Sequence, residues 1–384
     1  MPSRRDLLAA LGAGAVVGLA GCSAQDCTPA EPVGTDWPQP GGDPGNTAAA
    51  PDLSLPARVG ERWRTPIVPD SDLLAFAGAV VAGDRIIGAG RVPETGLLTD
   101  YDLQDGSTGT RVTVPEQIAT PPVSVSGFDA VTYATDDGSE LRLFDGGSDS
   151  GRYAFGNSPA TPRAAGTTLF GGDADGTFAY DVTSDEERWR REFGDEKEGG
   201  AVPFSPAVDD RWAYVTVTSS SDRGIYALNR LHGETEWSVE GPRASRAPVR
   251  VGPLLLVPTR HELLAFDAGT GERQWSLSTP ADRRTFLPPA GTESGLVVSD
   301  GTALHRIDPA TGDLGWSVDL GTAGRPIVVG DSAVVSGDDG VVAHELENGS
   351  ERWRLDRTSL VAPLANGVLV RRGDELVACT ACEN

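Results

Sequence analysis

The chain has 384 residues and a formal charge of −24, with 56 acidic residues against 32 Lys and Arg. Nucleic-acid binding requires a cationic surface, so this acidic balance excludes DNA or RNA as an expected partner. It also argues against adsorption to anionic lipid headgroups. The 48 glycines and 28 prolines favour many short strands joined by tight turns over long helices.

The N-terminus predicts export and lipidation. Arg4 and Arg5 precede a short apolar stretch from Leu7 to Leu19, which is typical of a twin-arginine signal. The stretch ends at Leu-Ala-Gly-Cys22, which is similar to the lipobox of lipoproteins, so the Cys22 thiol is the expected lipid acceptor. We therefore predict a signal peptide over 1–22 and a flexible tether over 23–56, rich in Pro, Gly, Asp and Thr.

The predicted location is the outer face of the cytoplasmic membrane, with the lipid as the attachment. The acidic composition, in which Lys197 is the one lysine, resembles that of proteins from extreme halophiles. The twin-arginine route carries proteins that are already folded, which suits a protein that folds in cytoplasmic salt.

Three cysteines remain after lipidation: Cys27, Cys379 and Cys382. The last two have C-x-x-C spacing, but a four-thiolate zinc site needs a second such pair. A disulfide is the default in an exported protein. Cys27 could pair with either of the others, or the two C-terminal cysteines could pair with each other; the sequence leaves this choice open.

An eleven-residue unit recurs along the chain. Its clearest copy runs from Ala265 to Trp275 and reads A-x-D-x-x-T-G-x-x-x-W. Further copies, some degenerate, begin at residues 100, 143, 179, 227, 306 and 343. Asp, Thr and Gly suit a tight turn between two strands, and a tryptophan on the second strand can bridge to a neighbouring sheet. Two more strand-like segments precede each unit, so each repeat predicts a four-stranded sheet, and such spacing is typical of a β-propeller.

The two chain ends each hold part of one more repeat. Residues 375–378 form a third strand with no tryptophan strand after it, whereas Trp63 lies on a fourth strand with no third strand before it. Pairing Trp63 with Leu376–Ala378 closes a ring. The prediction is an all-β propeller over 57–384 with eight four-stranded antiparallel blades. Six tryptophans are expected to dock neighbouring blades: Trp63, Trp189, Trp237, Trp275, Trp316 and Trp353.

These units resemble the PQQ-like repeats of quinoprotein dehydrogenases (PQQ is pyrroloquinoline quinone), where they are called tryptophan-docking motifs. The stretch from Trp37 to Thr47 is similar to the lead-in of PQQ-like propellers, so the resemblance covers about residues 37–384. It implies the fold more strongly than any activity, because one fold hosts many functions.

The resemblance implies two kinds of function. Quinoprotein dehydrogenases hold PQQ over the central channel with a vicinal disulfide and a calcium ion, but this chain has no adjacent cysteines and no calcium-loop spacing. Non-catalytic lipoproteins with the same repeats include the scaffolds that assist β-barrel assembly. We therefore expect a non-catalytic, monomeric scaffold that binds an exported or membrane protein and needs no cofactor. A PQQ-dependent enzyme and a glycan or solute receptor are the alternatives.

Three further expectations concern individual side chains. Arg163, Arg246 and Arg325 fall near innermost strands and are candidates for anion binding at the channel mouth. Asn348 lies in a glycosylation sequon on a predicted turn. The four histidines form no metal-binding or catalytic motif and are expected at the surface: His232, His261, His305 and His344.

Overall fold

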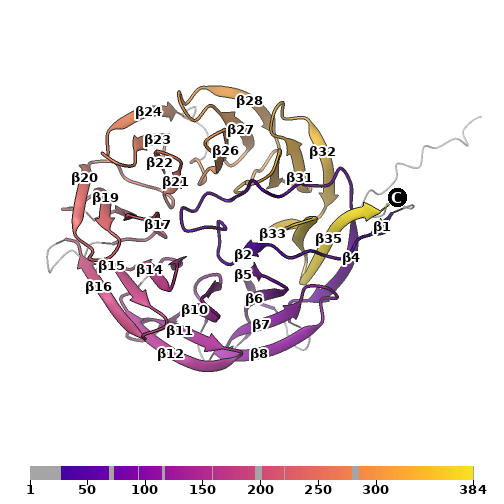
Figure 1. Ribbon diagram of the computed structural model, residues 1–384, viewed down its shortest axis with the longest axis horizontal. Helices are drawn as coiled ribbons and strands as arrows, with labels where there is room; N and C mark the ends of the chain where they lie inside the picture. Colours follow the sequence, from indigo (N-terminus) through magenta and orange to yellow (C-terminus); the bar gives the residue numbers. More distant parts are fainter. Residues whose placement is uncertain are drawn as a thin grey trace, which may run out of the picture.

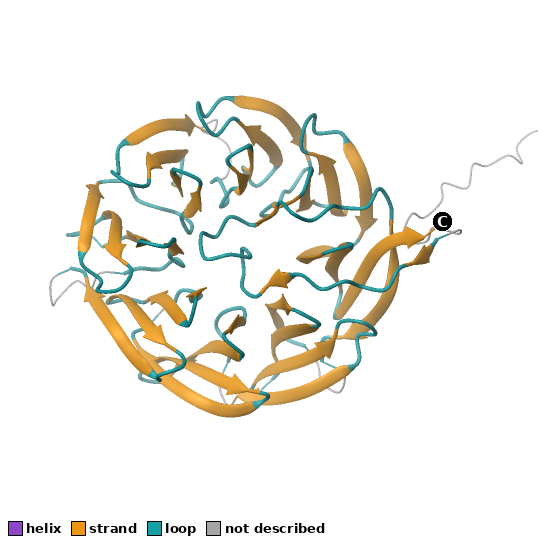
Figure 2. Cartoon of the chain, in the orientation of Figure 1, coloured by secondary structure: helices purple, strands orange, loops and turns teal. Residues whose placement is uncertain are grey.

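The computed structural model describes residues 27–68, 73–93, 95–114, 117–157, 159–194, 201–219, 221–278 and 285–383. These residues form strands and loops without a helix, so none forms a helix that could cross a membrane. The signal-peptide residues Arg4, Arg5 and Cys22 lie outside the described residues. The strands are arranged as radial sheets around a central axis (Figures 1 and 2).

Each blade has four antiparallel strands, which we number from the axis outwards in chain order. Blades 1 to 4 are β5(Ala75–Ala82), β6(Arg85–Arg91), β7(Gly96–Asp102), β8(Thr108–Val114); β9(Val123–Val125), β10(Phe128–Thr135), β11(Gly138–Asp145), β12(Ser148–Phe155); β13(Arg163–Ala165), β14(Thr168–Gly172), β15(Gly176–Asp181), β16(Glu186–Glu192); and β17(Ala207–Val208), β18(Trp212–Val217), β19(Gly224–Asn229), β20(Thr235–Glu240).

Blades 5 to 8 are β21(Val249–Val251), β22(Leu254–Pro258), β23(Glu262–Asp267), β24(Arg273–Ser278); β25(Ala290–Thr292), β26(Gly295–Ser299), β27(Ala303–Ile307), β28(Leu314–Asp319); β29(Ile327–Val329), β30(Ser332–Ser336), β31(Gly340–Glu345), β32(Glu351–Asp356); and β33(Ser359–Leu364), β34(Gly367–Arg372), β35(Glu375–Glu383), β4(Val59–Pro66). The prediction of eight four-stranded blades is confirmed.

The sequence of each strand reflects its radial position. Second strands such as β22 and β26 are buried along their whole length, because both faces pack on neighbouring blades. The outermost strand β20 instead alternates between exposed and half-buried residues, since its outer edge meets solvent. The resulting core runs between the blades all the way round the disc.

The six docking tryptophans join consecutive blades in one repeated way. Each indole N–H donates to a carbonyl oxygen beyond its own blade: Trp63 to Leu103, Trp189 to Arg230, Trp237 to Ala268, Trp275 to Pro309, Trp316 to Leu346 and Trp353 to Pro56, at 2.8–3.0 Å. In five of the six, the acceptor lies in the turn between the third and fourth strands of the next blade, and that turn's glycine lies over the indole. The repeat motif therefore encodes a contact between blades.

Replacing Gly312 by alanine tests this contact. Gly312 has φ +77°, and a Cβ there would lie 2.7 Å from the Trp275 ring. Gly127 is a matched control, because it has φ +88° and no atom within 4 Å of an added Cβ. We expect thermal unfolding to show a loss of about 1 kcal/mol for Gly127→Ala from the positive φ alone, and about 3 kcal/mol for Gly312→Ala. Equal losses would mean that the indole does not dock on this turn.

The ring closes where the sequence predicts. β4 pairs antiparallel with β35, so that Ala378 lies opposite Trp63 and Leu376 opposite Thr65. The acceptor for Trp353 is Pro56, which lies just before β4. Blade 8 therefore takes its fourth strand from the N-terminal side of the chain, and the ring is joined by main-chain hydrogen bonds.

The prediction of a flexible tether is wrong for residues 27–56. β1(Thr28–Pro29) pairs with β35, β2(Asp36–Trp37) pairs with β5, and β3(Ala49–Ala50) runs parallel to β29. Within this stretch Trp37 is only 4% exposed. The polar composition misled the prediction, because these residues are held by main-chain hydrogen bonds together with a few buried apolar side chains, Trp37, Ala48 and Leu55.

The structure also selects one of the open cysteine pairings. Cys27 forms a disulfide with Cys382 across a sequence separation of 355 residues, next to the β1–β35 pair. Cys379 lies outside the disulfide and is fully buried. The C-x-x-C spacing thus places one cysteine in the bond and the other in the core.

Candidate functional site

The centre of the disc is occupied by residues 33–50, here called the central segment (Figure 1, indigo). It contacts the inner edge of every blade. β2 pairs with β5 of blade 1, and one backbone N–H from each of the other seven blades donates to it at 2.7–3.0 Å: Ser124 to Pro38, Ala164 to the Gln39 side chain, Val208 to Pro44, Arg250 to Gly45, Gly291 to Thr47, Val328 to Ala48 and Ala365 to Val33. The segment therefore joins all eight blades at the axis.

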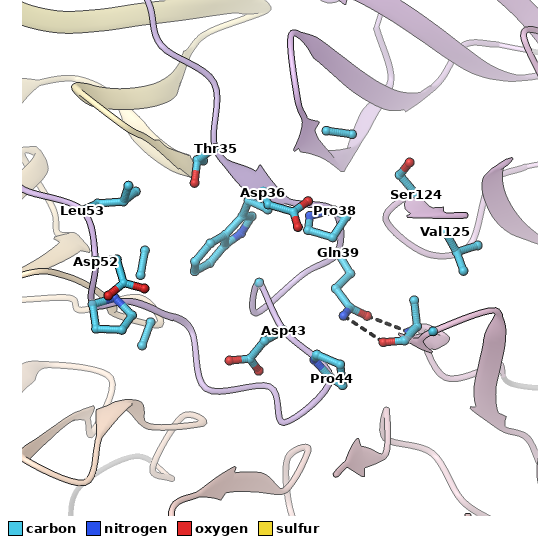
Figure 3. A pocket seen from close by; sticks show the side chains of 18 of the residues that line it. Thr35, Asp36, Pro38, Gln39, Asp43, Pro44, Asp52, Leu53, Ser124 and Val125 are labelled. Carbon is cyan, nitrogen blue, oxygen red and sulfur yellow. Dashed lines mark hydrogen bonds between the residues drawn. The ribbon is translucent and has the colours of Figure 1, made fainter. Parts of the chain in front are cut away.

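Physical chemistry explains why this sequence suits the position. The innermost strand of a blade has one unpaired edge, and its N–H groups need acceptors when they are buried. The central segment mostly supplies carbonyl oxygens, so Pro38, Pro40 and Pro44 lose nothing by lacking N–H donors. The Gln39 side chain acts like a strand residue, accepting from the Ala164 N–H and donating to its carbonyl (Figure 3).

Asn46 links three blades through a single side chain. Its Oδ1 accepts from Arg163 of blade 3 and from Arg325 at the start of blade 7, both at 2.9 Å. Its Nδ2 donates to the Pro248 carbonyl, which precedes blade 5, at 3.0 Å. The residue is 1% exposed and has φ +62°, a conformation that asparagine tolerates better than most residues.

Two of the three predicted channel-mouth arginines meet at this point. Arg163 also donates to the Pro40 carbonyl and Arg325 to the Asn46 carbonyl. Burial lowers the pKa of Arg163 to about 10 and that of Arg325 to about 9, so both remain cationic at neutral pH. Their hydrogen bonds go to neutral groups of the chain, which makes them supports for the central segment.

Arg246 does not join this pair. It is exposed, donates to the Ser245 carbonyl at 2.6 Å and lines a different pocket. The predicted cluster of three arginines at one channel mouth is therefore wrong. Arg163 is the first residue of β13 and Arg325 lies two residues before β29, and both reach Asn46 at the axis. Arg246, three residues before β21, lines the other pocket instead.

The central segment forms one side of an open pocket of about 600 Å³. Figure 3 shows Asp36, Asp43 and Asp52 around it, and no basic side chain lines it among the residues that the structure describes. Ser126 and Gly166, in the turns between first and second strands, line the opposite wall. We call this the acidic pocket; Asp43 is held in it by accepting from the Thr47 N–H at 2.9 Å.

The cofactors of quinoprotein dehydrogenases do not fit this centre. Across the described ranges, no group of three or more His, Cys, Asp or Glu side chains is arranged to hold a metal ion. The buried side chains at the axis are Gln39, Asn46 and Arg163, and their polar atoms bind the protein's own main chain or one another. We therefore derive no catalytic step through PQQ or calcium.

The remaining predicted residues are distributed over different blades. Asn348 is exposed in the turn between β31 and β32, where its Oδ1 accepts from the Ser350 N–H, so the glycosylation sequon remains a prediction. The surface prediction is wrong for His344, which is 2% exposed and donates from Nδ1 to the Gly349 carbonyl. Burial lowers the pKa of His344, so it is neutral in the core.

The fold and its docking motif define an eight-bladed propeller of the PQQ-like class. Residues 95–286 and 259–381 match the model of the family described as outer membrane protein assembly factor BamB. The chain belongs to this family. No curated protein matches the sequence.

Solved structures with the same fold include BamB and several dehydrogenases. BamB from Moraxella catarrhalis is 16% identical, with a TM-score of 0.65 over 84% of this chain and 99% of that one. The quinohemoprotein alcohol dehydrogenase from Comamonas testosteroni is 14% identical, with a TM-score of 0.69 over 90% of this chain and 80% of that one. A europium-containing methanol dehydrogenase is 12% identical, with a TM-score of 0.64 over 90% and 88%. At these identities the likeness shows the fold alone.

Proposed function

We propose that this protein is an exported, lipid-anchored, non-catalytic scaffold that binds a protein partner at the outer face of the cytoplasmic membrane. The observation that carries this proposal is the central segment. It hydrogen-bonds to all eight blades across the axis, over which quinoprotein dehydrogenases hold their quinone. Family membership with an assembly factor supports the same choice. The proposal covers scaffolding and does not extend to β-barrel assembly. Barrels are assembled in the outer membrane, and the halophile-type composition favours a cell that lacks an outer membrane of that kind.

The position of the disulfide supports attachment of the disc by its rim. Cys27 and Cys382 lie beside β1 and the C-terminal end of β35, at the outer edge of the ring (Figure 1). Cys22 precedes Cys27 by five residues, a length that spans at most about 18 Å. A lipid on Cys22 would therefore hold the rim close to the membrane while the two faces stay available for binding.

Replacing Cys22 by serine tests the anchor. The thioether acceptor is then missing, so we expect the exported protein to move from the membrane fraction to the medium. Replacing Cys379 by serine in parallel is the matched control and should leave the protein with the membrane. Cell fractionation followed by immunoblotting measures this, and a Cys22→Ser protein that stays membrane-bound would contradict lipid anchoring.

Two measurements separate a scaffold from an enzyme. The first purifies the membrane-anchored chain with a cleavable affinity tag after mild crosslinking and identifies bound proteins by mass spectrometry. We expect one exported or membrane protein in stoichiometric amount, absent from a parallel purification of an unrelated lipoprotein. A bound glycan in its place would favour the receptor alternative.

The second measurement adds PQQ and calcium to the purified chain. We expect neither quinone absorbance on the protein after gel filtration nor dye-linked oxidation of alcohols. Turnover above that of free PQQ would overturn the proposal in favour of a quinoprotein enzyme.

A further inference from the structure

A second pocket, of about 700 Å³, lies on the opposite face of the disc from the acidic pocket. Some of its lining residues, such as Arg260 and Gly301, lie in turns between the second and third strands of a blade. Others, such as Gly324, lie just before a first strand. The acidic pocket is bordered instead by turns between first and second strands. In an antiparallel blade these two sets of turns are at opposite ends, so the pockets open on opposite faces.

The lining of this second pocket has the reverse charge. Arg246, Arg260 and His261 line it, and none of its lining residues within the described ranges is acidic, although the whole chain carries a charge of −24. We call it the basic pocket. Arg246 makes one hydrogen bond, to the Ser245 carbonyl, and Arg260 has no ion pair with any residue that the structure describes. Both guanidinium groups are exposed and keep donors for a ligand.

Hydroxyl groups complete the donor set. Thr285, Thr322 and Ser336 line the same pocket. Ser336 Oγ accepts from the Leu360 N–H at 2.8 Å, which leaves its own hydrogen to donate. The Thr322 hydroxyl donates to Asp338 at 2.6 Å and is thereby already used. Leu287 and Ala323 are the apolar members of the lining, so the pocket suits a hydrophilic ligand.

The buried arginines add positive charge beneath the pocket. Arg325 directly follows Gly324 of the lining, and Arg163 shares Asn46 with it. Neither makes an ion pair with a carboxylate among the described residues, and both remain cationic at neutral pH. The Asp43 carboxylate offsets part of this positive charge, and the remainder favours an anion at the nearest accessible surface.

We propose that the basic pocket binds a carboxylate-bearing ligand, with Arg246 and Arg260 as the two guanidinium clamps. Arginine pairs with a carboxylate through two parallel hydrogen bonds, and a site with two such groups selects ligands with more than one carboxylate. Its volume is in the range of pockets that hold small molecules. Such carboxylates occur on free small acids and on acidic segments of polypeptides. This inference is independent of the scaffold proposal.

Calorimetric titration of the purified folded chain tests the pocket with three probes at constant ionic strength: citrate, a hexaglutamate peptide and sulfate. We expect citrate or the peptide to bind at one site and to bind more tightly than sulfate. Arg246→Gln with Arg260→Gln should weaken that binding about tenfold or more, whereas Arg273→Gln, which removes one arginine charge from the exposed outer strand β24, should change it less than twofold.

The outcomes are separable. Tighter binding of the peptide than of citrate would identify an acidic polypeptide as the source of the carboxylates, and the reverse would identify a small acid. Sulfate binding as tightly as both, or a double variant that binds as well as the unaltered chain, would overturn the proposal. A basic pocket that fails these tests leaves the scaffold proposal standing, because that proposal is tested by partner capture and PQQ reconstitution.

Discussion

Replacing Asn46 by glycine is expected to destabilise the ring by about 3 kcal/mol, measured by denaturant unfolding in the salt where the protein is folded. Glycine tolerates the φ of +62° at this position, so the change isolates the loss of the amide. That amide accepts from Arg163 and Arg325 and donates to Pro248. Its removal leaves two buried guanidinium groups short of an acceptor, which is the costly part.

Asn348→Gly is the control for Asn46→Gly. Asn348 is exposed, and its side chain makes one local hydrogen bond, to the Ser350 N–H. We expect a loss of about 1 kcal/mol or less there. If Asn46→Gly were as mild as this control, Asn46 would not hold the inner ends of three blades together.

Removing the disulfide should have the second large effect. In Cys27→Ser with Cys382→Ser, the unfolded chain is no longer closed into a loop of more than 350 residues. The expected loss is about 4 kcal/mol, because the crosslink restricts the unfolded ensemble most when the loop is long. The Cys22→Ser background gives a protein without the lipid for this measurement.

A reductant provides the matched comparison. Dithiothreitol should lower the Tm of the protein that keeps both cysteines to that of the double variant, and should leave the double variant unchanged. In the oxidised Cys22→Ser protein, without dithiothreitol, thiol titration after denaturation should find one reactive thiol, that of Cys379. Three free thiols would show that the ring is held without a covalent link.

The blades were predictable because each repeat carries its own signals. The turn motif from Asp267 to Gly271 and the tryptophan that follows it recur at nearly fixed spacing, and each has a local physical reason. Closure by β4 and β35 could be predicted because the C-terminal end has a third strand without a fourth, and the N-terminal end has a fourth strand without a third. The repeat was visible within windows of about forty residues, and closure needed only a comparison of the two chain ends.

The central segment could not be predicted in the same way. It has neither the alternation of a strand nor the periodicity of a helix, and its Pro-Gly-Asp composition is that of a linker. Its order comes from carbonyl oxygens that accept hydrogen bonds from backbone N–H groups of blades far away in the sequence. A local sequence pattern does not reveal such long-range hydrogen bonds. One signal was available: the stretch from Trp37 to Thr47 resembles the lead-in of PQQ-like propellers, and a bulky Trp37 in a linker requires a partner.

The arginines show a similar limit. Sequence position places Arg163, Arg246 and Arg325 near innermost strands, but it does not fix the direction of each side chain. Arg163 and Arg325 turn to the axis and bind Asn46, whereas Arg246 faces solvent in the basic pocket with Arg260. Arg260 was not singled out from the sequence, because the turn between β22 and β23 carries no motif.

Hydrogen–deuterium exchange over residues 36–50 tests the central claim most directly. Gly42, Asp43, Asn46 and Ala48 donate their N–H groups to carbonyls within the segment, and the segment is held by all eight blades. We predict exchange as slow as that of the inner strands β13 and β29 in the purified oxidised protein. Complete exchange of these amides within seconds would show a free linker, and the ring would then have an open centre.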